Sequence, residues 1–309
     1  MEHLKYAKYL NKHVSDLSGQ TFVITGANSG IGFYTSLLLI SKNAHIVMAC
    51  RSKVRAEEAR LKLLKVNPFG VVDILIYDQA SFLSIDQFAD ELQGKYPKIN
   101  GFVFNAGIFH PKKDAATTDG FPLTIGTNYL GAFYLFEKLN PYFERNINMH
   151  VVSVGSLANI MFHTGKFYKY FTCFKINIFR QYALSKMFLM ANFTNFTLKE
   201  NCSVQYSLMH PGVASTNIVS GPSNSYPDWF ARLAKKFMLT FMNHPEKSAL
   251  GVVLLLTKEN AHGNYSRPRG LLGVSGYPKI TKPPRYLTKR RTEVRDNTLS
   301  FFQSLNNSK

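Results

Sequence analysis

The chain has 309 residues, 45% of them hydrophobic, and carries a formal net charge of +18. This length and apolar content suffice for one large core, and no Pro/Gly/Ser-rich linker or repeat divides the chain, so one domain with a short tail is the simpler interpretation. The charge is compatible with a solvated basic surface, with steering of anionic ligands, or with binding of nucleic acid or anionic lipid. The basic residues are spread out and no nucleic-acid motif accompanies them, so no nucleic-acid partner is expected.

The targeting and redox features of the sequence are equally plain. The first twenty residues are polar and charged, and no run approaches ~18 uninterrupted apolar residues, so neither a secretory signal nor a transmembrane helix is expected. The three cysteines form no disulfide framework, and no Cys/His cluster has zinc-ligand spacing. We therefore expect a cytoplasmic protein without a metal site.

Three parts are expected along the chain: a lead helix at 1–17, a main domain at 18–270 and a tail at 271–309. The lead helix could pack on the body, which we favour, or lie on a membrane surface. The tail is basic at 289–291, which indicates a solvated charge run or, as a minority view, contact with anionic membrane. Apolar residues at 294–305 could form a last helix on the body.

The main domain opens on a glycine-rich loop. Thr21-Phe-Val-Ile24 predicts a strand, Thr25-Gly-Ala-Asn-Ser-Gly-Ile-Gly32 follows it, and 33–40 has helical character. In this context glycines allow a tight turn, close approach of backbone to a pyrophosphate and close packing of helix on strand, while the helix N-terminus faces the anion. The loop residues expected to bind a dinucleotide are Gly26, Asn28, Ser29, Gly30, Ile31 and Gly32.

The second strand, predicted at 44–50, decides between two cofactors. In dinucleotide folds an acidic residue at this strand's end favours NAD. Here Cys50 stands where the acid would be and Arg51 follows it. A guanidinium can pair with a 2′-phosphate in a fork, so we predict NADP(H) rather than NAD(H).

Polar or small residues follow each later strand. Asp78 after 71–77 could accept from an adenine amino group or cap the next segment. Asn105-Ala106-Gly107 closes the strand at 100–104. A hydroxyl, Ser156, follows the strand at 149–154. Pro211, Gly212, Val213 and Thr216 follow the strand at 203–209, and Asn128 lies early in the helix after a turn at 118–120.

Strands that alternate with helices at this rhythm predict an α/β fold with a doubly wound, Rossmann-type parallel sheet and helices on both faces. Right-handed crossovers then bring the strand ends above to one edge of the sheet, where open α/β sheets bind ligands.

Two segments, Tyr134-Leu-Phe-Glu-Lys138 and Tyr182-Ala-Leu-Ser-Lys186, put a tyrosine and a lysine four residues apart on a helix. A nearby ammonium favours the ionised phenol and so lowers its pKa, which suits proton transfer to a carbonyl. The second pair follows Ser156 by one loop, whereas the first shares its helix with Asn128 and has no hydroxyl-bearing strand end just before it. The sequence therefore selects Tyr182 and Lys186.

Together these motifs resemble the short-chain dehydrogenase/reductase family, and within it the retinol-dehydrogenase-like branch, from about Ser18 to Thr257. The resemblance implies that Tyr182 is the general acid or base, that Lys186 binds the nicotinamide ribose and lowers the pKa of Tyr182, and that Ser156 holds the substrate oxygen. It also implies that Asn128 anchors a water in a proton relay. Asn105, Ala106 and Gly107, with Pro211, Gly212, Val213 and Thr216, would line the cofactor.

Two positions depart from the family pattern. Phe104 replaces the first of a doubled asparagine, and Gly155 replaces the first of paired serines. The departures concern fine geometry rather than activity, since Asn105 and Ser156 are kept.

The substrate side is indicated only by composition. An aromatic and basic loop at 161–174 could form one wall of an apolar pocket or be a packed surface loop, and 215–243 resembles the family's substrate lid. We expect an NADP(H)-dependent oxidoreductase for an apolar ketone or aldehyde and its alcohol. The alternative is a catalytically silent dinucleotide-binding regulatory protein. A homodimer is possible through 187–193, which could equally be core.

Overall fold

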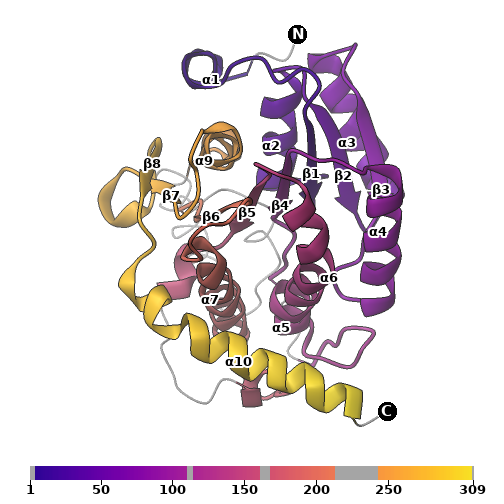
Figure 1. The fold of residues 1–309 in the computed structure, drawn as a ribbon, viewed down its shortest axis with the longest axis vertical. Coiled ribbons are helices and arrows are strands. Elements are labelled where there is room, and N and C mark those ends of the chain that lie inside the picture. The colour runs from indigo at the N-terminus through magenta and orange to yellow at the C-terminus, as the bar shows by residue number, and fades with distance from the viewer. Residues whose placement is uncertain (1–3, 110–113, 161–167, 213–242, 308–309) are drawn as a thin grey trace, which may run out of the picture.

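The computed structural model describes residues 4–109, 114–160, 168–212 and 243–307. The chain forms one eight-stranded sheet in the order β3-β2-β1-β4-β5-β6-β7-β8 (Figure 1). Neighbouring strands are parallel except β7 and β8, which are antiparallel. The strands are β1 (Thr21–Thr25), β2 (His45–Cys50), β3 (Val72–Ile76), β4 (Gly101–Phe104), β5 (His150–Val154), β6 (Gln205–Met209), β7 (Tyr265–Pro268) and β8 (Pro278–Thr281).

Helices cover both faces of the sheet, as predicted. One apolar core joins the sheet to α1, α2, α3 and α9, and the other joins it to α4, α6, α7 and α10. The α-helices are α1 (Ala7–His13), α2 (Gly30–Ile40), α3 (Lys53–Val66), α4 (Phe82–Lys95), α5 (Leu123–Ile125), α6 (Ala132–Arg145), α7 (Ile178–Thr197), α9 (Pro245–Thr257) and α10 (Arg285–Asn307). Short helices of other types are the π-helix η1 (Gly126–Gly131) and the 3-10 helices η2 (Leu157–Ile160), η3 (Tyr168–Tyr170) and η4 (Leu271–Gly273).

The predicted Rossmann-type sheet is confirmed, with the strand order of a doubly wound fold in β3 to β6. All six predicted strands are present. In β1, β2, β4 and β5 the runs are mostly apolar and almost fully buried, whereas β3 is only partly buried and β6 depends on Tyr206, Leu208 and Met209. The antiparallel pair β7 and β8 was not predicted. Their sequences, Tyr265-Ser-Arg-Pro268 and Pro278-Lys-Ile-Thr281, are short, proline-bounded and partly charged, so they lack the pattern of an interior strand.

The core on the α6 and α7 side of the sheet is rich in aromatic rings. Phe102 and Phe104 of β4 face Phe143 of α6 and Phe193 of α7, and the ring centroids of Phe104 and Phe193 are 4.9 Å apart. All four side chains are at most 2% exposed. Burial of this kind stabilises the fold by roughly 1.5–3 kcal/mol per large side chain. Phe104, which departs from the family pattern, therefore belongs to the core.

The lead helix packs on the body. Leu10, Val14 and Leu17 are at most 4% exposed, and the backbone N–H of Tyr6 donates to the Glu246 carboxylate at the start of α9. This confirms the packed interpretation over a membrane-surface helix. Among the helices that the structure describes, none is long and apolar enough to cross a membrane.

A glycine at the entrance to α6 tests how closely the layers are packed. A Cβ at Gly131 would lie 2.0 Å from the carbonyl oxygen of Gln79, so no side chain fits without a backbone shift, whereas a Cβ at Gly94 of α4 meets nothing within 4 Å. We expect Gly131→Ala to lower the free energy of unfolding by at least about 2 kcal/mol. Gly94→Ala should raise it by about 0.5–1 kcal/mol, because alanine is the better helix former. Urea denaturation of both variants measures the contrast, and equal effects would contradict it.

Candidate active site

The glycine-rich loop joins β1 to α2 in the geometry of an anion site. Gly26 and Gly30 have φ angles of 67° and 56°, which favour glycine, and Ser29 before α2 makes no side-chain capping bond. The first N–H groups of α2 therefore have no side-chain cap at the loop. A Cβ at Gly32 would lie 2.5 Å from both the Gly26 carbonyl oxygen and Asn105 Nδ2, so this glycine is required for close packing.

Asn105 ties the loop to the end of β4. Its side-chain Nδ2 donates to the carbonyl oxygen of Thr25 at 2.8 Å, and its backbone N–H donates to Thr25 Oγ1 at 2.9 Å. The Thr25 hydroxyl in turn donates to the carbonyl of Val103 at 3.0 Å, and it also accepts from Ala106 N–H. These bonds lock the carboxyl ends of β1 and β4 together.

The end of β2 offers a positive surface beside a neutral thiol. Burial raises the pKa of Cys50 to about 11, so this thiol stays uncharged at neutral pH. Arg51 is exposed, and Lys53 and Arg55 in the first turn of α3 are exposed as well. Arg55 was missed by the sequence analysis, because only its position in the first turn of α3 brings it near this strand end. Asp78, half-buried, uses Oδ1 to accept from the Ala80 N–H at 3.0 Å, so it caps its own turn whether or not it also meets an adenine.

The π-helix η1 presents Asn128. Its Oδ1 accepts from the Ile108 N–H at 2.7 Å, and its Nδ2 donates to the Ile108 carbonyl at 2.8 Å and to Ser185 Oγ at 3.1 Å. The side chain is fully buried. Asn128 thus links the segment after Gly107 to α7. Single π-turns of this kind are rare and concentrate at functional sites.

Gln79 supports this π-helix and was missed by the sequence analysis. Its Nε2 donates to the carbonyl of Thr127 at 2.6 Å and to that of Ala106 at 3.2 Å, while its Oε1 accepts from the Tyr77 hydroxyl at 2.7 Å. The side chain is 5% exposed. One buried amide therefore connects the ends of β3 and β4 with η1. A buried glutamine leaves no periodic pattern in a sequence, so only the fold reveals it.

Ser156 and Tyr182 lie close together at the carboxyl end of β5, which we call the catalytic edge because the predicted site residues lie there. Tyr182 lies in the first turns of α7, and Ser156, which follows β5, is near enough to its hydroxyl to lower the pKa of the phenol. Burial raises the pKa of Tyr182 above its ordinary value, and the proximity of Ser156 offsets this only in part. In the unliganded protein the net direction is therefore upward rather than the predicted downward shift, because burial is the largest effect on this pKa. A phenol with a raised pKa stays protonated at neutral pH.

Lys186 lies one turn further along α7 and is buried. Its side chain is 3% exposed, its Nζ donates to the carbonyl of Val154 at 3.3 Å, and burial lowers its pKa to about 8. A Cβ at Gly107 would lie 3.0 Å from Lys186 Nζ and 3.2 Å from Asn128 Oδ1. Gly107 therefore leaves space directly in front of the ammonium, and a bound ribose hydroxyl fits the chemistry of these two groups.

The turn after β6 is only partly described. Gly212 has a φ angle of 74°, and its N–H donates to His210 Nδ1 at 3.0 Å. The carbonyl of Pro211 accepts from Ser248 Oγ at 3.1 Å. Val213 and Thr216, predicted to line the cofactor, lie outside the described residues, as does the lid predicted at 215–243 except for its last residue.

The rival pair does not reach this edge. The Tyr134 hydroxyl donates to both carboxylate oxygens of Asp86, at 3.0 and 3.2 Å, and Lys138 Nζ pairs with the same carboxylate at 2.6 Å. Both side chains thus point to α4. The choice of Tyr182 and Lys186 over Tyr134 and Lys138 agrees with this geometry.

Two phenylalanines border Tyr182. The ring of Phe109 lies edge-on to that of Tyr182 at 5.5 Å between centroids, and Phe179 packs on Phe109 at 5.2 Å. Phe179 is 49% exposed and Ile160, after Ser156, is 46% exposed. The approach to the phenol is therefore apolar. Sequence analysis missed Phe109 and Phe179, since neither stands in a motif.

The aromatic and basic loop divides between core and undescribed chain. Residues 161–167 lie outside the described part, while Phe171 is fully buried and packs on Tyr129, Phe188 and Phe301. This favours the packed-loop interpretation for its second half. Met187, Phe188, Met190 and Phe193 are at most 1% exposed, so they belong to the core rather than to a dimer face.

The other departure from the family pattern has a packing reason. A Cβ at Gly155 would lie 2.4 Å from the Met190 sulfur, so a side chain at this position would require the Met190 side chain to move. The Gly155 N–H donates to the carbonyl of Met209 at 2.7 Å, which holds this end of β5 to β6.

The sequence matches the model of the short chain dehydrogenase family over residues 20–222, about two thirds of the chain. The chain belongs to this family. Retinol dehydrogenase 14 of Mus musculus is 31% identical over 221 residues, which cover 65% of this chain and 63% of the relative. Dehydrogenase/reductase SDR family member 13 of Bos taurus is 35% identical over 146 residues, covering 47% and 38%. These similarities agree with the retinol-dehydrogenase-like branch.

Among solved structures, a protein from Mycobacterium Paratuberculosis superposes with a TM-score of 0.69 at 22% identity, covering 92% of both chains. At this identity the likeness shows the fold alone. The chain aligns with less than two thirds of the length of the two curated relatives.

The buried ammonium makes stability depend on pH. The folded pKa of Lys186, about 8, lies below the ordinary 10.5, so below pH 8 both states are protonated and the folded state carries the full cost of burying the charge. We expect Lys186→Met to stabilise the unliganded protein at pH 7 on the order of 1–3 kcal/mol. The advantage should shrink as pH rises from 8 toward 10, because the folded wild type then loses the proton. Urea denaturation at both ends of this range measures it. Exposed Lys62→Met is the control, and a destabilised Lys186→Met at pH 7 would refute the sign.

Proposed function

We propose that the protein is an NADP(H)-dependent oxidoreductase that interconverts an apolar ketone or aldehyde and its alcohol, with Tyr182 as the general acid and base. The observation that carries this proposal is the convergence of Asn128, Ser156, Tyr182 and Lys186 at one edge of the sheet. Asn128 donates to Ser185 on α7, the helix that also carries Tyr182 and Lys186, and Ser156 lies near Tyr182. A protein that only bound a dinucleotide would have no need of this arrangement.

In the proposed reduction, Ser156 donates a hydrogen bond to the substrate oxygen and holds it beside the Tyr182 hydroxyl. Tyr182 then donates its proton to that oxygen as negative charge develops on it. Lys186 keeps a positive charge next to the phenolate that remains, and Asn128 would anchor a water through which a replacement proton reaches Lys186. The bound nicotinamide supplies the hydride. In alcohol oxidation, the phenolate of Tyr182 accepts the proton.

The cofactor preference rests on the end of β2. A neutral thiol at Cys50 adds no charge that would repel a 2′-phosphate, and Arg51, Lys53 and Arg55 are exposed around it. Guanidinium groups bind phosphate in a fork, and the first turn of α3 favours an anion. These features support NADP(H) over NAD(H).

The substrate class rests on the aromatic border of Tyr182. Phe109 packs against the ring of Tyr182, and Phe179 packs on Phe109 and is 49% exposed, so covering Phe179 with an apolar substrate would be favourable. A bulky apolar carbonyl fits it better than a sugar does.

The general acid is tested by two matched tyrosines. Tyr182→Phe should lower kcat for NADPH-dependent carbonyl reduction by at least about 100-fold, because it removes the proton donor. NADPH affinity should change little. Tyr134→Phe loses a hydroxyl of the rival pair and should keep kcat near that of the wild type. A screen of retinoid, steroid, quinone and aliphatic carbonyls supplies the substrate. Undiminished turnover by Tyr182→Phe would exclude the mechanism, and NADPH binding without any turnover would favour the silent binding protein.

The cofactor preference is tested at Arg51. Arg51→Ala should weaken NADPH binding by roughly 10- to 100-fold, the worth of a charge-assisted hydrogen bond, and should leave NADH binding unchanged. Arg60→Ala on α3, which loses an ion pair with Glu57, is the control. Fluorescence titration with both nucleotides gives the affinities. Equal losses for NADPH and NADH would overturn the preference.

A further inference from the structure

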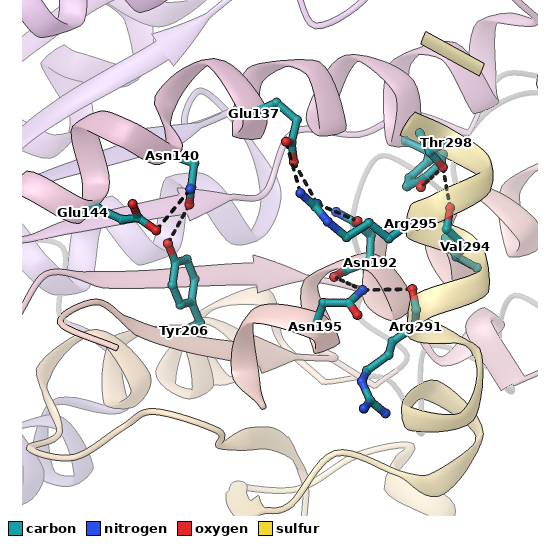
Figure 2. Close-up of polar contacts among 11 residues, drawn as sticks. Glu137, Asn140, Glu144, Asn192, Asn195, Tyr206, Arg291, Val294, Arg295 and Thr298 are labelled. Carbon is teal, nitrogen blue, oxygen red and sulfur yellow. Dashed lines mark hydrogen bonds and ion pairs between the residues drawn. The ribbon is translucent and has the colours of Figure 1, made fainter. Parts of the chain in front are cut away.

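Helix α10 is a long element outside the six-stranded Rossmann unit, and it lies along α7 (Figures 1 and 2). Leu287, Val294 and Thr298 face inward and are fully buried. Two prolines directly before the helix restrict its entrance, because they fix φ near the helical value. The helix therefore has a defined direction and a defined inner face.

Polar contacts fix its position on the body. Figure 2 shows Arg295 reaching Glu137 of α6, with Nη1 and Nη2 donating to the two carboxylate oxygens at 2.8 and 3.1 Å. Asn195 of α7 donates from Nδ2 to the backbone carbonyl of Arg291 at 2.9 Å. Thr298 and the Tyr129 hydroxyl of η1 are hydrogen-bonded at 2.5 Å. A bidentate ion pair and two further hydrogen bonds allow α10 little freedom to slide.

The first turn of α10 carries a tyrosine that reaches the catalytic edge. The Tyr286 hydroxyl donates to Asn159 Oδ1 at 2.7 Å, and it is also hydrogen-bonded to the hydroxyl of Tyr265 on β7. Asn159 is 1% exposed, so water does not replace this partner. Without the Tyr286 hydroxyl, a buried amide oxygen would lose its donor, which costs about 1–3 kcal/mol and favours rearrangement of the turn that carries it.

That turn begins at Ser156. The Asn159 N–H donates to the Ser156 carbonyl at 3.2 Å, and the Ala158 N–H donates to Ser156 Oγ at 3.2 Å. Ser156 is also the side chain whose proximity lowers the pKa of Tyr182, so its hydroxyl lies near the phenol. A single 3-10 turn thus connects the Asn159 side chain to the hydroxyl of Ser156, and any shift of Asn159 moves that hydroxyl relative to Tyr182.

We propose that Tyr286 is a positioning residue: through Asn159 it sets the orientation of Ser156 toward Tyr182. Tyr286 touches neither substrate nor cofactor in this role. The contacts of Arg295, Asn195 and Thr298 hold the helix that presents it. This inference rests on the proposed function for its effect on turnover, but the geometry that it describes exists in the unliganded protein.

The first experiment does not need turnover. Tyrosine labelled with carbon-13 at Cζ gives an NMR signal whose position reports the hydrogen bonding of each phenol, and Tyr182→Phe identifies the signal of Tyr182. Tyr286→Phe should shift that signal, because the contact between Ser156 and Tyr182 changes. The matched control is Tyr142→Phe on α6. The Tyr142 hydroxyl is also partly buried, and it donates to the backbone carbonyl of Tyr96. Tyr142→Phe should leave the Tyr182 signal in place.

The second experiment separates positioning from general destabilisation. In carbonyl reduction with NADPH, Tyr286→Phe should lower kcat about tenfold, the equivalent of ~1.4 kcal/mol, and leave the KM for NADPH within about twofold. Tyr142→Phe should lower thermal stability comparably without lowering kcat. If Tyr286→Phe acted only by lowering stability, the two variants would have similar kcat values, so a lower kcat in Tyr286→Phe alone indicates positioning.

The outcomes distinguish the two proposals. An unmoved Tyr182 signal in Tyr286→Phe overturns the positioning role, whether or not the wild type reduces any carbonyl. If Tyr286→Phe shifts the Tyr182 signal but the wild-type protein reduces no carbonyl, the positioning role is supported and the proposed function is refuted. A shift of equal size in Tyr142→Phe would show a general change in packing and would also overturn the inference.

Discussion

The catalytic edge depends on one constraint: a lysine ammonium held almost without water between β4, β5 and α7. Burial of Lys186 disfavours its charged form, so the structure around it must supply oxygen atoms and must leave room for a polar ligand. The carbonyl of Val154 supplies an oxygen atom, and the missing side chain of Gly107 leaves the room. Glycines and small residues at the strand ends are therefore a condition for this lysine, not only for the nucleotide.

The π-helix η1 has contacts on two sides, toward the site and toward α10. The π-turn in front of α6 aims Asn128 into the site, while its neighbour Tyr129 bonds Thr298 of α10 on the opposite side. The buried amide of Gln79 satisfies the carbonyl of Thr127 within this turn. An irregular helix, a buried glutamine and an added C-terminal helix thus stabilise one another around a single asparagine.

The sequence predicted the parts of the fold and site that local patterns determine. Six strands could be placed because each is a buried apolar run, and Asn105, Tyr182 and Lys186 could be selected because their order and spacing are specific. Gln79, Phe109 and Tyr286 could not, because their roles depend on contacts between segments far apart in the chain. The direction of the Tyr182 pKa also failed, since burial exceeds any effect of the lysine charge, and burial is a property of the packed structure. The departures at Phe104 and Gly155 looked like losses in the sequence and are explained by neighbours in the core.

The contacts of α10 have a consequence for the order of folding. Thr298 bonds a residue 169 positions earlier, and Tyr286 bonds one 127 positions earlier. Contacts of such long range form late, because closing a long loop costs entropy before the contact compensates for it. During synthesis, which proceeds from the N-terminus at roughly 5–20 residues per second, the parallel sheet and its glycine loop can be complete while Ser156 still lacks its support. We therefore expect the contact between Tyr286 and Asn159, and with it the support of Ser156, to form late in folding.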